Sequence, residues 1–275
     1  MVLLANLLNL KINLIIALFI GLSSSYGQSI VTDSLLVKDE IIAFSQDRNG
    51  NIFLGFKGGA ITKYSPTLDS ILSFSPTKPG DITLLEAWHG FQIFVFTEAF
   101  QEFTIFDRFL TQNSNFRLSE TTTTYVDICT ISGDQNIWIF EENHLQLTKL
   151  NLKIGEIENE FSLEFIFNSN DHQITYLKEY QNLVFLIDAL SGIYIFDNLG
   201  NYLKKINAPG IKHCSFKNEQ LYYIVNNEIH AIGLYQANHD VIKIAGTDYL
   251  GVLAIEKGFL LVKKNLLIKL LADLH

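Results

Sequence analysis

The sequence predicts an all-β protein, a six-bladed β-propeller, from three observations: evenly spaced apolar runs, turn residues before each run, and a polar strand closing most units. The six runs begin at Ile52, Ile93, Ile137, Leu183, Leu221 and Phe259, at intervals of 41, 44, 46, 38 and 38 residues. About 40 to 45 residues is the length of a four-stranded propeller blade. The spacing therefore indicates one small sheet used six times.

Turns divide each unit into strands. The segments DRNGN (47–51), SGDQN (132–136) and EYQN (179–182) precede three of the apolar runs, and a further apolar segment such as VDICTI precedes each turn. Asn and Gly tolerate the positive φ that tight hairpins require. Each unit is thus expected to begin with an inner strand, a hairpin turn and a second buried strand.

The closing strand of most units is more polar and alternates in hydropathy, as in SILSF, NFRL, EIENEF, YLKKI and DVIKI. Inner strands of stacked blades are covered on both faces, whereas an outer strand is half solvated. This gradient predicts the order of the strands from the channel outward.

The last unit lacks a closing strand, because LLIKL is followed by only a few residues. The segment SIVTDSLLV (29–37) precedes the first inner strand and belongs to no unit. We expect it to complete the sixth blade and close the ring. The alternative for the C-terminal segment NLLIKLLADL is a terminal helix, because apolar residues recur at 267, 270, 271 and 274. An outer-membrane barrel is disfavoured, because its strands would alternate over about ten residues.

Residues 1–27 carry one charged residue, Lys11, and an apolar stretch followed by small residues, which predicts a signal peptide cleaved near Gly27. The alternative is a retained membrane anchor. The stretch after Lys11 is about ten residues, whereas crossing a bilayer takes about twenty. Residues 28–275 are then one propeller domain without a membrane span, exported to the periplasm or the outer-membrane periphery of a Gram-negative type of envelope.

Charge and cysteine content exclude two classes of protein. The mature chain carries 19 basic and 29 acidic residues, and no Lys or Arg cluster exceeds two residues. Nucleic-acid binding needs a basic footprint, so this class is excluded. Cys129 and Cys214 are the only cysteines and lie in apolar strands, which predicts two buried thiols rather than a disulfide framework.

Three stretches resemble known propeller blades: DRNGNIFLGFKGGAITKYS, SGDQNIWIFEENHLQLTKL and SGIYIFDNLGNYLKKI. They are similar to NHL-like six-bladed propellers and to the two-component-regulator type of propeller repeat. The pattern covers most of Ser29 to Leu271 and is degenerate in the second, fifth and sixth units. The resemblance implies a fold and no chemistry, since such families mostly bind or scaffold, with a minority of lyases, hydrolases and lactonases.

No metal or cofactor is expected. The seven histidines show no pair at metal-ligand spacing, and no serine elbow or glycine-rich phosphate loop is present. Asp47, Asn49 and Asn51 alternate as a calcium loop begins, but Gly50 and the strand that follows favour a hairpin.

Two groups of residues are candidates for function. Glu86, Asp127 and His213 are ionisable residues in inner strands, where a charge must face the channel or find a partner. We interpret them as channel-lining candidates for binding. Trp88, Phe91, Phe100 and Phe103 form an aromatic group of the second unit and are candidates for docking a partner.

These features favour a non-enzymatic, exported platform that binds another envelope protein, such as an accessory capping or plug subunit of an outer-membrane secretion or assembly complex. Its acidic body favours a partner with a polar or basic docking patch. The alternative is a channel-mouth hydrolase or lyase acting on a glycan or small molecule, which requires acids and a histidine to converge.

Overall fold

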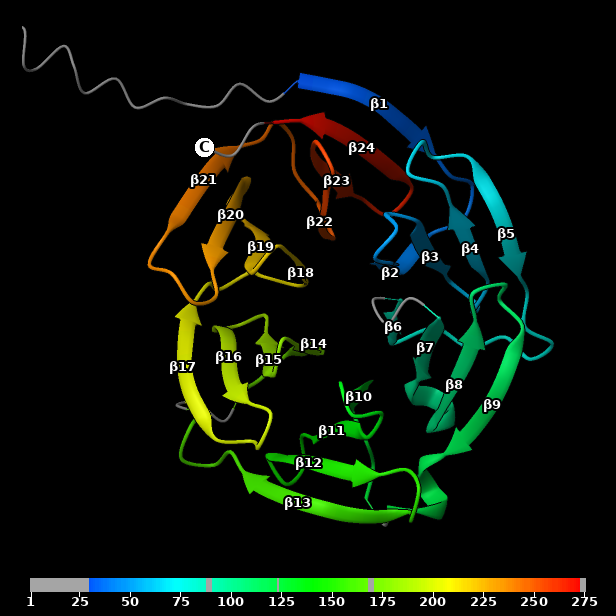
Figure 1. The fold of residues 1–275 in the computed structure, drawn as a ribbon, viewed down its shortest axis with the longest axis vertical. Helices are drawn as coiled ribbons and strands as arrows, with labels where there is room; N and C mark the ends of the chain where they lie inside the picture. Colours follow the sequence, from blue (N-terminus) through cyan, green and yellow to red (C-terminus); the bar gives the residue numbers. More distant parts are fainter. Residues whose placement is uncertain (1–29, 88–90, 123, 168–170, 273–275) are drawn as a thin grey trace, which may run out of the picture.

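A computed structural model describes residues 30–87, 91–122, 124–167 and 171–272, and it shows six four-stranded antiparallel sheets around a common axis (Figure 1). The chain is a six-bladed β-propeller, as the repeat spacing predicts. The expected signal peptide lies outside the described residues. Within those residues, no helix is long and apolar enough to cross a membrane.

The first three blades follow one another along the chain, each running from the channel outward. The first consists of β2 (Ile41–Gln46), β3 (Ile52–Phe56), β4 (Ile61–Tyr64) and β5 (Ser70–Phe74). The second consists of β6 (Leu84–Glu86), β7 (Gln92–Thr97), β8 (Glu102–Asp107) and β9 (Gln112–Arg117), with the short 3-10 helices η1 (Glu98–Phe100) and η2 (Leu118–Glu120). The third consists of β10 (Ile128–Ile131), β11 (Ile137–Glu141), β12 (Gln146–Asn151) and β13 (Glu156–Ser162).

The remaining blades repeat this order with one exception. The fourth consists of β14 (Ile174–Tyr180), β15 (Leu183–Asp188), β16 (Gly192–Asp197) and β17 (Tyr202–Asn207). The fifth consists of β18 (Cys214–Lys217), β19 (Gln220–Val225), β20 (Glu228–Gly233) and β21 (His239–Lys243). The sixth consists of β22 (Gly251–Ile255), β23 (Gly258–Val262), β24 (Leu266–Leu271) and, outermost, β1 (Ile30–Leu36).

Ring closure by the N-terminal strand is confirmed. Strand β1 pairs antiparallel with β24 from Ile30 opposite Leu271 to Leu36 opposite Leu266, with one irregularity (Figure 1). The backbone N–H of Val37 continues the pairing by donating to the carbonyl of Asn265 at 2.9 Å. The helix alternative for the C-terminal segment is therefore wrong over β24, because a helix there would leave the edges of β1 and β23 without a partner.

The meander gives the ring two different faces. The crossover face carries the start of every inner strand and the connections between blades, including residues 37–40, 75–83, 208–213 and 244–250. The turn face carries the hairpins that join the first to the second strand of each blade and the third to the fourth strand of the first five blades. The latter hairpins are residues 65–69, 108–111, 152–155, 198–201 and 234–238 in the first five blades.

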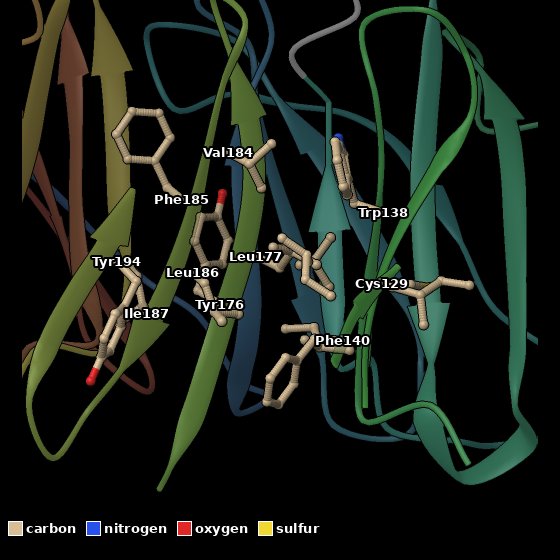
Figure 2. Packing of buried hydrophobic residues seen from close by; sticks show 14 of the residues in the cluster. Cys129, Trp138, Phe140, Tyr176, Leu177, Val184, Phe185, Leu186, Ile187 and Tyr194 are labelled. Atoms are coloured by element: carbon tan, nitrogen blue, oxygen red, sulfur yellow. The ribbon is translucent and has the colours of Figure 1, made fainter. Parts of the chain in front are cut away.

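Buried apolar side chains fill the spaces between neighbouring blades rather than a single central core. Figure 2 shows this between the third and fourth blades, where Trp138 and Phe140 lie opposite Leu177 and Val184 in the same buried cluster. Separate clusters join the first blade to the second and to the sixth. Each fully buried Phe or Leu contributes about 1.5–3 kcal/mol of hydrophobic stabilisation. The stacked blades therefore hold their loops on a rigid frame.

One hairpin differs from the sequence interpretation. Strand β14 continues through Tyr180, so Glu179, expected in the turn 179–182, belongs to the strand and is buried. Its carboxylate accepts hydrogen bonds from the indole Nε1 of Trp138 at 2.6 Å and from the backbone N–H of Gly133 at 3.1 Å. These bonds compensate for the burial of a charged group and tie the fourth blade to the third.

Candidate functional site

Glu86, the first channel-lining candidate, is the last residue of β6 and is only 1% exposed. Its Oε2 atom lies 2.6 Å from Nζ of Lys178, in the inner strand of the fourth blade. The sequence interpretation did not include Lys178, because it lies 92 residues away in a run that reads as apolar strand. This buried ion pair joins the inner strands of the second and fourth blades.

Asp127, the second candidate, lies one residue before β10 at the crossover face, not within the strand. Its Oδ2 atom accepts the backbone N–H of Glu142 at 2.6 Å. Burial raises the pKa of the Glu142 carboxyl, and the neighbouring negative charges of Asp127 and Asp188 raise it further, while His172 acts in the opposite direction. This part of the crossover face is therefore acidic.

His213, the third candidate, directly precedes β18 and is 8% exposed. Its ring centroid lies 4.1 Å from that of Phe44 and 4.5 Å from that of Tyr176, so one ring from each of three blades meets here. Gly251 permits this packing, because a Cβ atom there would lie 2.8 Å from Cζ of Phe44 and 3.0 Å from Cβ of His213.

The imidazole of His213 is held neutral. Burial and, to a smaller extent, the positive charge of Lys178 lower its pKa from 6.5 to about 3. A contact with the Phe44 backbone raises the pKa, but by less than the other two effects lower it. Within the described part of the chain, neither ring nitrogen forms a hydrogen bond of normal geometry. A neutral imidazole offers one donor and one acceptor.

The three candidates do not form one hydrogen-bonded group. Glu86 ends its strand on the side of the turn face, whereas Asp127 and His213 precede theirs at the crossover face. Glu86 is paired with Lys178, and Asp127 caps the backbone of Glu142. General acid–base chemistry requires its groups within hydrogen-bond reach of one reacting atom, and the contacts of these three residues lead elsewhere.

A cavity of about 230 Å³ lies at the crossover-face mouth of the channel. The described residues that line it lie around the beginnings of the inner strands of five blades, and none of them belongs to the third blade. Its lining includes Phe44, Leu84, Thr175, Tyr176, Lys212 and His213. The cavity is mostly apolar with a few polar groups, which is the usual character of a small-molecule pocket.

The structure places the described residues of the aromatic docking group in different surroundings. Phe103 is 1% exposed and packs between Phe94 and Phe116, with ring centroids at 5.2 and 4.9 Å, so it belongs to the core. Phe100 is half-buried on the crossover face beneath Nζ of Lys78, 3.8 Å from its ring centroid. Phe91 is 75% exposed on the turn face. Trp88 lies outside the described residues.

A row of apolar side chains on the turn face was missed by the sequence interpretation. The hairpins between the third and fourth strands of the second to fifth blades each expose one large apolar residue, 58–65% exposed. These turn-tip residues are Phe109, Ile154, Leu199 and Tyr235. The available signal was the hairpin register, since each of these side chains follows the third strand of its blade at a similar position.

Short polar side chains fix the geometry of these tips. The Oδ1 atom of Asp197 accepts the backbone N–H groups of Leu199 and Asn201 at 2.9 and 2.8 Å, and Asp107 does the same for Phe109 and Thr111 at 2.8 and 2.9 Å. Such Asx turns hold the chain in a tight loop. The apolar tip is therefore presented on an ordered turn.

The expected hairpin at 47–51 is confirmed. The Oδ1 atom of Asp47 accepts the backbone N–H groups of Asn49 and Asn51, both at 2.9 Å, and its Oδ2 atom accepts the Asn51 amide at 2.7 Å. The carboxylate thus stabilises the turn itself. Cys129 and Cys214 are buried and free, as predicted.

The structure brings two histidines together that the sequence spacing did not pair. The Nδ1 atom of His230 lies 2.9 Å from Nε2 of His239 on the neighbouring strands β20 and β21. A structural zinc site has four ligands. In the part of the chain that the structure describes, no group of three or more His, Cys, Asp or Glu side chains is placed to hold a metal ion.

The chain matches no protein-family model and no curated protein. Its fold is similar to that of several solved propellers. Selenomethionine-substituted virginiamycin B lyase from Staphylococcus aureus matches at 12% identity and a TM-score of 0.59, covering 86% of this chain and 82% of the lyase. The β-propeller domain of Cps50 (Swd1) from Myceliophteria thermophila matches at 9% identity and a TM-score of 0.66, covering 90% and 100%. Likeness at such low identity establishes the fold and leaves the function to the site.

Proposed function

We propose that this chain is a non-enzymatic propeller that docks a protein partner through its turn face. The observation that carries the proposal is the row of turn-tip residues Phe109, Ile154, Leu199 and Tyr235, one on each of four successive blades, together with Phe91. Exposed aromatic and large aliphatic side chains of this kind can serve as the anchors of a protein interface.

The rigidity of the row favours docking. Asx turns at Asp107 and Asp197 order two of the tips, and the hydroxyl of Tyr235 donates to the carbonyl of Gln181 at 2.9 Å. Hairpins whose backbone is already ordered lose little conformational entropy on association. The row therefore suits a partner with a complementary, preformed surface.

The leader sequence and the charge of the chain indicate the kind of partner. The apolar leader of residues 1–27 supports export, and the mature body is acidic. The partner is accordingly an envelope protein whose docking surface is apolar at its centre and polar or basic at its rim. An accessory role in an outer-membrane secretion or assembly complex is compatible with this chemistry.

The hydrolase or lyase alternative gains less support. It needs two acids and a histidine at one reacting centre, and the carboxylate of Glu86 is already engaged by Lys178. The imidazole of His213 lies between two aromatic rings instead of beside a carboxylate.

The test compares two double variants by affinity capture from the native envelope and mass spectrometry. Phe109→Ser with Leu199→Ser alters the turn face, and Phe165→Ser with Leu190→Ser alters exposed apolar residues of the crossover face. Central apolar residues of an interface typically contribute about 2 kcal/mol or more each, so the first variant should lose its partner by at least about ten-fold. The second should retain it. Equal capture by both variants, or a monomer without a partner, contradicts the proposal.

A further inference from the structure

We propose that the crossover-face cavity binds a small, uncharged, ring-containing molecule that carries one hydroxyl or amide group. This inference goes beyond the proposed docking role, because the cavity and the turn tips lie on opposite faces of the ring. A partner bound to the turn face leaves the cavity mouth open.

The size of the cavity limits the ligand. An apolar cavity of about 150 Å³ holds a benzene molecule. At about 230 Å³, this cavity has room for one substituted ring. Its walls are largely apolar, with Leu84 and the aromatic residues Phe44 and Tyr176 among them, so apolar contact contributes most of the affinity.

Polar atoms without partners point to the hydrogen-bonding group of the ligand. His213 is more than nine-tenths buried and lines the cavity, and within the described residues its ring nitrogens form no hydrogen bond of normal geometry, apart from a weaker contact with the Phe44 backbone. The Oγ1 atom of Thr175, a second lining residue, is likewise buried without a partner there. Leaving buried polar atoms unsatisfied costs free energy. A ligand hydroxyl or amide inside the cavity can reach one of these atoms once the lining side chain turns toward it, and then forms the hydrogen bond that the atom lacks.

The charges around the cavity favour a neutral ligand. Lys212, which is exposed, is the only charged side chain among the described lining residues apart from the neutral imidazole of His213. A cation finds no carboxylate in this lining. An anion finds only the solvent-exposed ammonium of Lys212, which compensates little for the hydration that the anion loses in a largely apolar cavity. An uncharged molecule avoids both costs.

The experiment uses p-cresol as the probe and toluene as its isostere without the hydroxyl. Binding to the whole mature domain is measured by saturation-transfer NMR, with titration calorimetry where the affinity permits. One neutral hydrogen bond corresponds to about a five-fold change in affinity. We expect saturable binding of p-cresol, with toluene bound about five-fold more weakly.

Two variants and a matched control locate the site. His213→Phe keeps a ring and removes the nitrogens, and Thr175→Val removes the hydroxyl. Each should weaken p-cresol binding about five-fold while leaving toluene binding unchanged. The matched control is Thr148→Val, because Thr148 also has a buried hydroxyl without a partner but does not line the cavity.

A cavity-filling variant keeps the test valid if His213→Phe does not fold. Ala189 lines the cavity, so Ala189→Leu should exclude both probes while circular dichroism shows an intact propeller. Three results overturn the proposal: no saturable binding of p-cresol, equal affinity for p-cresol and toluene, or affinities unchanged in Thr175→Val and Ala189→Leu. None of these results affects the turn-face proposal, which is tested on other residues.

Discussion

Nζ of Lys178 lies 2.6 Å from Oε2 of Glu86, and both side chains are almost completely buried. The contact joins the inner strand of the fourth blade to that of the second, across 92 residues of sequence. Burying two charges is costly, so such a pair holds only when each charge compensates the other. It therefore fixes the relative position of two blades near the axis.

Removing the cation should destabilise the ring strongly. Lys178→Met leaves the carboxylate of Glu86 buried without this counter-charge, which lowers the free energy of unfolding by about 3–5 kcal/mol. Chemical denaturation followed by circular dichroism measures the change. The double variant Lys178→Met with Glu86→Leu should recover much of the loss, since neither charge of this pair is then buried. A single variant as stable as the parent would show that the pair contributes nothing.

Removing the closing strand should open the ring. A chain that begins at residue 38 lacks β1, which pairs with β24 at six positions. At about 1 kcal/mol for each ladder hydrogen bond, the free energy of unfolding should fall on the order of 3–5 kcal/mol relative to a chain that begins at residue 28. Thermal unfolding compares the two chains.

The same truncation has an internal control. A synthetic peptide of residues 29–37 should restore the lost stability when added in excess. The same peptide with Leu35→Asp should restore less, because Leu35 packs against the cluster between the sixth and first blades. A truncated chain with an unchanged midpoint would show that ring closure does not depend on β1.

Acid should weaken the fold through His213. The pKa of this residue is about 3 in the folded chain and ordinarily 6.5, because burial disfavours the imidazolium. Above about pH 6.5 the full contribution of the neutral ring to stability is present. As the pH falls toward 3, the unfolded chain takes up a proton that the folded chain does not, and stability is lost.

The measurement is the slope of unfolding free energy against pH. Between roughly pH 4 and 6, the slope of the parent should exceed that of His213→Phe by up to about 1.4 kcal/mol per pH unit. Carboxylates titrate in both proteins, so their contribution cancels in the difference. Identical slopes would mean that His213 takes up its proton in the folded state.

The two thiols should resist modification. Burial raises the pKa values of Cys129 and Cys214, and the thiolate is the reactive form. An aromatic disulfide reagent should release almost no chromophore from the folded protein and two equivalents after denaturation. Cys129→Ala and Cys214→Ala assign any residual signal. Rapid labelling of one thiol in the folded chain would show that its strand opens locally.

The strands could be predicted because their signals are local. Continuous apolar runs such as Ile52–Phe56 become strands buried on both faces, and turn residues such as Asp47 form hydrogen bonds within their own hairpin. Strand β1 could be predicted by counting strands, because the sixth unit lacked an outer strand and the segment 29–37 belonged to no unit. The exposure of Phe103 was predicted wrongly, since residues in one short stretch alternate between the space beside a neighbouring blade and solvent.

The sequence by itself determined the number of blades, their strand order and the burial of both thiols, because hydropathy and turn chemistry act over a few residues. Only the tertiary structure decided that Lys178 neutralises Glu86, that His213 lies between Phe44 and Tyr176, and that four apolar tips share one face. The physical reason is that the twist and stacking of the blades bring together side chains from distant repeats, and no local pattern encodes which of them meet.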